Sequence, residues 1–118
     1  MSIVYIGKET PIRKLIELIF TDSDHDFYSY NNLSDCELVI KDLFPSLVLM
    51  DLDNEFEWPK LDKSLEGVVA QIPVVGIGEN DSRPSNEFVS FHYLKTILKP
   101  LNPGLFLEEV DKILKRKN

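Results

Sequence analysis

The sequence predicts a single α/β domain in which helices cover both faces of one parallel five-stranded sheet. Three observations support this fold class. The chain has 118 residues, which suffice for one hydrophobic core. Short unbroken apolar runs, typical of parallel strands buried on both faces, recur along it. Segments with helical spacing of apolar residues separate these runs. Five such units predict a doubly wound (βα)5 domain over residues 1–118.

The predicted strands are of two kinds. The segment Asp26–Tyr30 alternates in polarity and is rich in aromatic residues, which is typical of an edge strand. The others are continuous apolar runs and are therefore expected to be buried. They are Ile3–Ile6, Leu47–Met50, Val74–Ile77 and Thr96–Leu98.

Each strand is followed by a helical pattern. Thr10 is placed to cap the first helix, with Pro11 as its first residue. The last helix is entered through Asn102 and Pro103. The apolar stripes, in chain order, are Ile12, Leu15, Ile16 and Ile19; Cys36, Val39, Ile40 and Leu43; Leu61, Leu65, Val68 and Val69; Phe88 and Phe91; and Phe106, Val110, Ile113 and Leu114.

Composition excludes several functions. Lys and Arg total 13 against 20 Asp and Glu, a net charge of −7, so we expect no direct nucleic-acid binding. The single cysteine excludes an internal disulfide. No apolar run reaches the roughly 18 residues of a membrane span. The N-terminus lacks a signal-peptide pattern, so a cytoplasmic location is expected.

The topology predicts where a site should lie. Right-handed crossovers favour the flavodoxin-like strand order 2-1-3-4-5, with a ligand pocket at the carboxyl ends of strands 1 and 3. Asp51 and Lys99, although far apart in sequence, are expected to face this pocket together. The residues that follow the strands there are Gly7, Lys8, Glu9, Asp51, Leu52, Asp53, Gly78, Glu79, Lys99 and Pro100.

Three segments carry a family resemblance. Pro45–Asp51, Ile72–Ile77 and Leu98–Leu101 resemble, in order, strand 3, strand 4 and the Lys-Pro after strand 5 of response regulator receiver domains, the CheY-like family. The likeness covers essentially the whole chain. It implies that Asp51 occupies the phosphate-accepting position and that Lys99 is the lysine beside it.

The same resemblance implies a degenerate pocket. The family has two acidic residues after strand 1 that help to hold Mg²⁺, where this chain has Gly7 and Lys8, with Glu9 next. The family's hydroxyl residue after strand 4 is replaced by Gly78, and its aromatic residue in strand 5 by Thr96.

Few metal ligands remain. The weak candidates for Mg²⁺, which prefers six oxygen ligands, are Asp51, Glu9 and the region of Asp53. Lys8 either neutralises Asp51 as a built-in cation or points into solvent. We therefore expect no resident cofactor and at most weak Mg²⁺ binding.

Two signalling hypotheses follow. The first is an atypical receiver, or pseudo-receiver, that acts through protein–protein interaction with weak or no Mg²⁺-dependent phosphorylation of Asp51. The alternative is a functional phosphoreceiver that accepts phosphate from a histidine kinase, for example as the N-terminal regulatory domain of a transcription factor. An enzyme is not expected. Asp51-Leu-Asp53 superficially resembles a dehalogenase-type phosphatase motif, but it follows the third strand instead of the first.

Two surfaces are candidates for partners. By resemblance, the face formed by the helix at Phe88 and Phe91, the last strand and the last helix is a homodimer surface. Phe56 and Trp58, in the loop after strand 3, either contact a signalling partner or pack onto the following helix. The dimer face would expose the apolar residues Phe88, Tyr93, Leu101 and Leu105.

Overall fold

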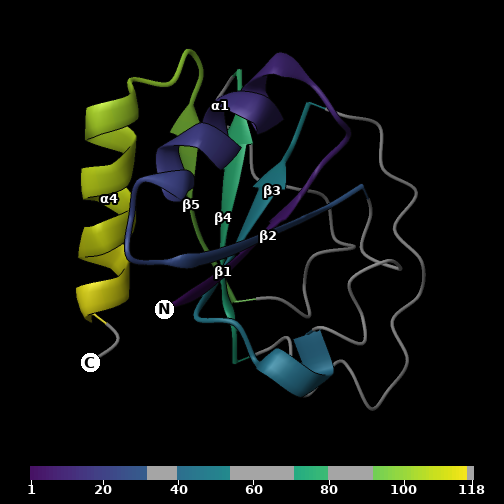
Figure 1. Ribbon diagram of the computed structural model, residues 1–118, viewed down its shortest axis with the longest axis vertical. Helices are drawn as coiled ribbons and strands as arrows, with labels where there is room; N and C mark the ends of the chain where they lie inside the picture. Colours follow the sequence, from purple (N-terminus) through teal and green to yellow (C-terminus); the bar gives the residue numbers. More distant parts are fainter. Residues whose placement is uncertain (32–39, 54–70, 80–91, 117–118) are drawn as a thin grey trace.

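The computed structural model describes residues 1–31, 40–53, 71–79 and 92–116 (Figure 1). Five strands form one sheet in the order β2-β1-β3-β4-β5, and every neighbouring pair is parallel. The predicted fold class and strand order are therefore confirmed. The strands are β1 (Ser2–Ile6), β2 (Asp26–Tyr30), β3 (Leu47–Asp51), β4 (Pro73–Gly78) and β5 (His92–Leu98).

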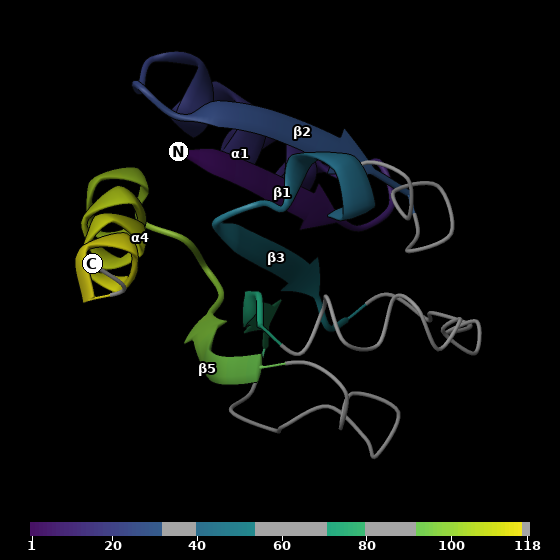
Figure 2. The same ribbon diagram turned by 90° about the horizontal axis from the view of Figure 1, so that it is seen from below.

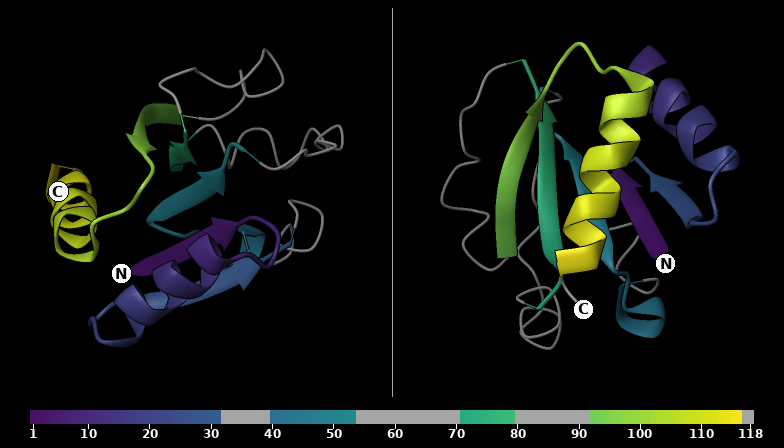
Figure 3. Two further views of the ribbon diagram at one scale, coloured as in Figure 1. Left: turned by 90° about the horizontal axis from the view of Figure 1, so that it is seen from above. Right: turned by 90° about the vertical axis from the view of Figure 1, so that its left-hand side faces the viewer.

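Two helices, α1 (Pro11–Thr21) and α4 (Pro103–Arg116), lie on the same face of the sheet (Figure 3). The hydroxyl of Thr10 accepts a hydrogen bond from the backbone N–H of Arg13 at 3.3 Å, so the predicted N-cap of α1 is confirmed. Residues 40–43 are also helical. No described helix is long and apolar enough to cross a membrane.

One core cluster lies between the sheet and these two helices. All residues of β3 and β4 are buried, as their unbroken apolar sequences predict. The ring of Phe20 stacks on Phe27 at 5.0 Å and meets Phe106 edge-on at 6.0 Å between centroids. Because these rings come from α1, β2 and α4, aromatic packing joins both helices to the edge of the sheet.

The last helix is held at two further points. The side chain of Asn102 accepts a hydrogen bond from the N–H of Leu105 at 3.1 Å, which confirms the predicted entry into α4. His25 Nε2 lies 2.8 Å from Asp111 Oδ1 and so links the start of β2 to α4. Figure 2 shows α4 at one side of the sheet, close to the end of β5 that leads into it.

Strand β5 is longer than predicted. The sequence indicated Thr96–Leu98, whereas the strand starts at His92. Its first half includes the exposed residues Leu94 and Lys95, because β5 is an edge strand. An unbroken apolar run indicates a buried strand, and the first half of β5 has no such run.

Several predictions concern residues outside the described ranges. These are the helices around Leu61–Val69 and Phe88–Phe91, the core position of Cys36, and the loop residues Phe56 and Trp58.

Candidate functional site

Asp51 is the last residue of β3, and only 2% of it is exposed. Its Oδ1 lies 3.2 Å from Lys99 Nζ and accepts a hydrogen bond from the N–H of Asp53 at 3.0 Å. Its Oδ2 accepts a hydrogen bond from the hydroxyl of Tyr5 at 3.4 Å. Both oxygens of this buried carboxylate therefore already have partners.

Lys99, directly after β5, lies between two carboxylates. Besides Asp51, its Nζ contacts Asp53 Oδ2 at 2.8 Å. Burial alone would lower the pKa of Lys99, but the hydrogen bond to Asp53 and the charge of Asp51 outweigh it, so the pKa is raised. The ammonium therefore stays protonated at neutral pH. Its backbone N–H donates to the carbonyl of Gly78 at 2.9 Å, which aligns the ends of β4 and β5.

Asp53 connects the loop after β3 to the segments that follow β4 and β5. Its Oδ1 accepts a hydrogen bond from the N–H of Glu79, after β4, at 3.3 Å. Burial would raise the pKa of Asp53, but the hydrogen bonds from Lys99 and Glu79 lower it overall. Asp53 was expected at this pocket and as a weak metal candidate, and in the structure its side chain binds Lys99.

Tyr5 is a site residue that the sequence analysis missed. Its side chain is fully buried, and its hydroxyl reaches Asp51 from β1. Burial, followed by the charge of Asp51, raises the pKa of the Tyr5 phenol, which therefore stays a hydrogen-bond donor. A tyrosine among the aliphatic residues of a buried strand is a signal that could have been noticed, because a buried hydroxyl needs a partner.

Gly7 lies directly against the tyrosine. A Cβ atom at Gly7 would stand 2.9 Å from both Tyr5 Cε1 and Tyr5 Oη, and 3.0 Å from the Cβ of Asp51. Contacts shorter than 3.0 Å are essentially never made by real Cβ atoms. The loop after β1 can therefore run this close to Asp51 only because residue 7 has no side chain.

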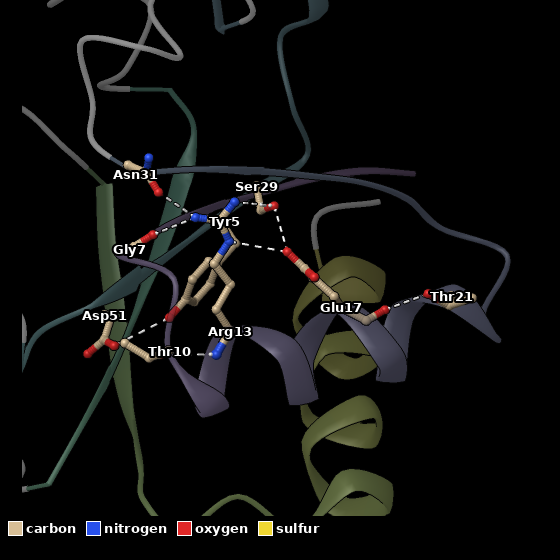
Figure 4. A network of polar contacts seen from close by, with 9 residues as sticks. All are labelled: Tyr5, Gly7, Thr10, Arg13, Glu17, Thr21, Ser29, Asn31 and Asp51. Atoms are coloured by element: carbon tan, nitrogen blue, oxygen red, sulfur yellow. Dashed lines mark hydrogen bonds and ion pairs between the residues drawn. The ribbon is translucent and has the colours of Figure 1, made fainter.

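Arg13, in α1, holds this loop through the carbonyl of Gly7 (Figure 4). Its Nη1 donates to the carbonyl of Gly7 at 3.2 Å and to Asn31 Oδ1 at 2.6 Å. Its other donors reach Ser29 Oγ at 3.1 Å and Glu17 Oε1 at 3.2 Å. One guanidinium thus connects the ends of β1 and β2 with α1. The i,i+4 spacing of Arg13 and Glu17 is the only sequence signal for it.

The other predicted site residues differ in their exposure. Lys8 and Glu9 are exposed, so the structure favours the solvent-facing interpretation of Lys8. Gly78 is buried at the end of β4. Thr96 is half-buried in β5, where it lines a groove next to α4. Within the described ranges, no three or more His, Cys, Asp or Glu side chains group together as a metal site requires.

Comparisons with known proteins agree on the fold. No protein-family model and no curated protein sequence matches the chain. Among solved structures, the N-terminal domain of a response regulator/sensory box/GGDEF protein from Carboxydothermus hydrogenoformans matches with a TM-score of 0.74 at 16% identity, over 99% of this chain and 96% of that one. A two-component response regulator from Clostridium difficile matches with a TM-score of 0.69 at 21% identity, over 100% of this chain and 98% of that one.

A third match is the chemotaxis protein CheY4 of Vibrio cholerae, with a TM-score of 0.72 at 12% identity over 95% of this chain and 97% of that one. Because the aligned lengths are nearly complete on both sides, the likeness concerns the whole domain. The chain has the fold of response regulator receiver domains, and Asp51 and Lys99 meet at the carboxyl edge of its sheet.

Proposed function

We propose that this chain is a receiver-type signalling domain that works by binding a protein partner, and that Asp51 is phosphorylated weakly or not at all. One observation carries the proposal: the carboxylate of Asp51 is already bound by Lys99, Tyr5 and the N–H of Asp53. A binding role needs a fixed surface, and these contacts hold the carboxylate of Asp51 in one position. A catalytic role is not proposed.

The chemistry of phosphorylation explains why this matters. A carboxylate oxygen must approach phosphorus, and the charge that develops on the phosphoryl oxygens needs a metal ion or an equivalent. The described residues do not fit Mg²⁺, because only Asp51 and Asp53 converge and both bind Lys99. A lysine ammonium cannot bridge two oxygens in place of a divalent ion.

The alternative is a working phosphoreceiver that takes its phosphoryl group from a histidine kinase, for example as the N-terminal regulatory domain of a transcription factor. The contact between Asp51 and Lys99 at 3.2 Å favours it, because the resemblance to receiver domains pairs the same two residue types. Under this hypothesis Tyr5 would have to leave Asp51 before reaction.

Phosphoramidate separates the two hypotheses without a kinase. In the reaction, an Asp51 oxygen attacks phosphorus, the P–N bond breaks, and the nitrogen leaves as ammonia after taking a proton. We expect intact mass spectrometry in Mg²⁺ buffer to show no phosphoryl adduct, while a metal-dependent receiver domain in the same buffer is modified. An adduct that Asp51→Asn abolishes would establish the alternative.

A further inference from the structure

We propose that the side chain of Tyr5 fills the space beside Asp51 and so closes this pocket, as a built-in stopper. We also propose that this arrangement requires glycine at position 7. The proposal deepens the proposed function and rests on it in one respect: it takes the pocket of Asp51 as closed. Tyr5 is the residue that closes the pocket, and the side chains tolerated at positions 5 and 7 depend on each other.

Strand geometry creates this dependence. Successive side chains of a strand point to opposite faces, so residues 5 and 7 share a face. The main chain keeps the register of β1 through residue 7, since the N–H of Gly7 donates to the carbonyl of Tyr30 at 2.9 Å. The ring of Tyr5 therefore passes over Gly7 toward Asp51 and fills the space where a side chain at position 7 would begin.

The stopper acts mainly through its volume. The hydrogen bond between the Tyr5 hydroxyl and Asp51 is 3.4 Å long, which is beyond the usual range for such bonds, so it adds little. The ring, in contrast, is fully buried and cannot turn into solvent. The hydrogen bond from Arg13 to the carbonyl of Gly7, at 3.2 Å, opposes a movement of Gly7 away from the ring.

This geometry explains why an acidic residue at position 7 does not fit beside Tyr5. In the sequence, Gly7 marks the loss of an acidic residue that a single substitution would restore. In the structure, an aspartate at position 7 meets the Tyr5 ring at its Cβ atom. An acidic pocket can therefore return only if Tyr5 is shortened at the same time.

A double-mutant cycle tests the dependence. Gly7→Ala is made in the wild-type chain, with Tyr5→Val, and with Tyr28→Val as a matched control, since Tyr28 is 39% exposed on β2. We expect Gly7→Ala to lower the urea midpoint clearly in the wild type and with Tyr28→Val, and clearly less with Tyr5→Val, where only the 3.0 Å approach to the Cβ of Asp51 remains. If Tyr5→Val does not fold, Tyr5→Leu replaces it. An equal loss in all three backgrounds would overturn the proposal.

The effect of Mg²⁺ on the thermal midpoint provides a second test. We expect Mg²⁺ to raise the thermal midpoint of Tyr5→Val/Gly7→Asp/Lys8→Asp and to leave Gly7→Asp/Lys8→Asp unchanged. Equal responses of these two variants would contradict the stopper. The two proposals fail separately: a phosphoryl adduct on the wild type defeats the proposed function, whereas additive effects of Tyr5 and Gly7 substitutions defeat the stopper alone.

Discussion

At the scale of single residues, Lys99 is the only cation that the described structure places between Asp51 and Asp53. We predict that Lys99→Gln lowers the free energy of unfolding by about 3 kcal/mol, because it leaves the buried Asp51 carboxylate without its charged partner. Urea unfolding at neutral pH measures this. Lys95→Gln is the control, since Lys95 is exposed and pairs with Glu109. Similar losses in both variants would contradict the assignment.

The same substitution has a defined pH dependence. The pKa of Asp53 is lowered from 3.8, so its share of the stability is present above that value and is lost as the pH falls through the lowered pKa. The pKa of Lys99 is raised from 10.5, so its share is complete below 10.5 and is lost as the pH rises through the raised pKa. We predict that Lys99→Gln flattens the stability profile at both ends.

The sequence predicted the meeting of Asp51 and Lys99 because both follow buried strands whose carboxyl ends must share one edge of the sheet. It did not predict Tyr5, because a pattern of apolar runs treats tyrosine as one more core residue and says nothing of its hydroxyl. The direction of Lys8 was equally beyond reach, since loop conformation decides whether the side chain turns inward.

At the scale of elements, Arg13 connects α1 with the ends of β1 and β2 through four acceptors. We predict that Arg13→Lys lowers the free energy of unfolding by about 1–2 kcal/mol, because an ammonium cannot reproduce the planar fork of donors. Amide exchange at Gly7, whose N–H bonds Tyr30, should accelerate. Lys14→Arg, on the exposed side of α1, should change neither quantity.

The strands were predictable where their sequences show a clear pattern, either an unbroken apolar run or an alternation in polarity. Strand β2 was predicted with its observed bounds, and β3 is one residue longer than predicted, Asp51 being the addition. The N-terminal half of β5 was not predicted, because His92–Lys95 shows neither an unbroken apolar run nor a clear alternation in polarity. Helix α1 was predicted from its Thr10 cap, which is local chemistry that the sequence displays directly.

At the scale of the whole molecule, a groove of about 360 Å³ runs between β5 and α4. Leu98 and Leu105 line it and are 50% and 64% exposed. Exposed leucines beside a groove suit a self-complementary twofold contact. We predict a dimer through this face at about 100 µM, independent of phosphorylation, in sedimentation experiments.

A charge in the groove tests this dimer. Leu105→Asp should give a monomer with an unchanged thermal midpoint, whereas Leu18→Asp, on α1 and 66% exposed, should stay dimeric. A wild-type chain that sediments as a strict monomer at this concentration would refute the prediction. The strand order followed from the sequence because handedness rules leave few topologies, but no such rule predicts what covers an exposed face.

The position of Lys99 has a mechanical consequence. Strands β3 and β5 are not neighbours, since β4 lies between them, yet Lys99 joins the end of β5 to Asp51 and Asp53 after β3. The pairing of β4 with β5 is irregular between Val74 and Val75, toward the opposite end. We therefore expect the separation of β5 from β4 to start at His92 and to proceed toward Leu98, so that the end held by Lys99 opens last.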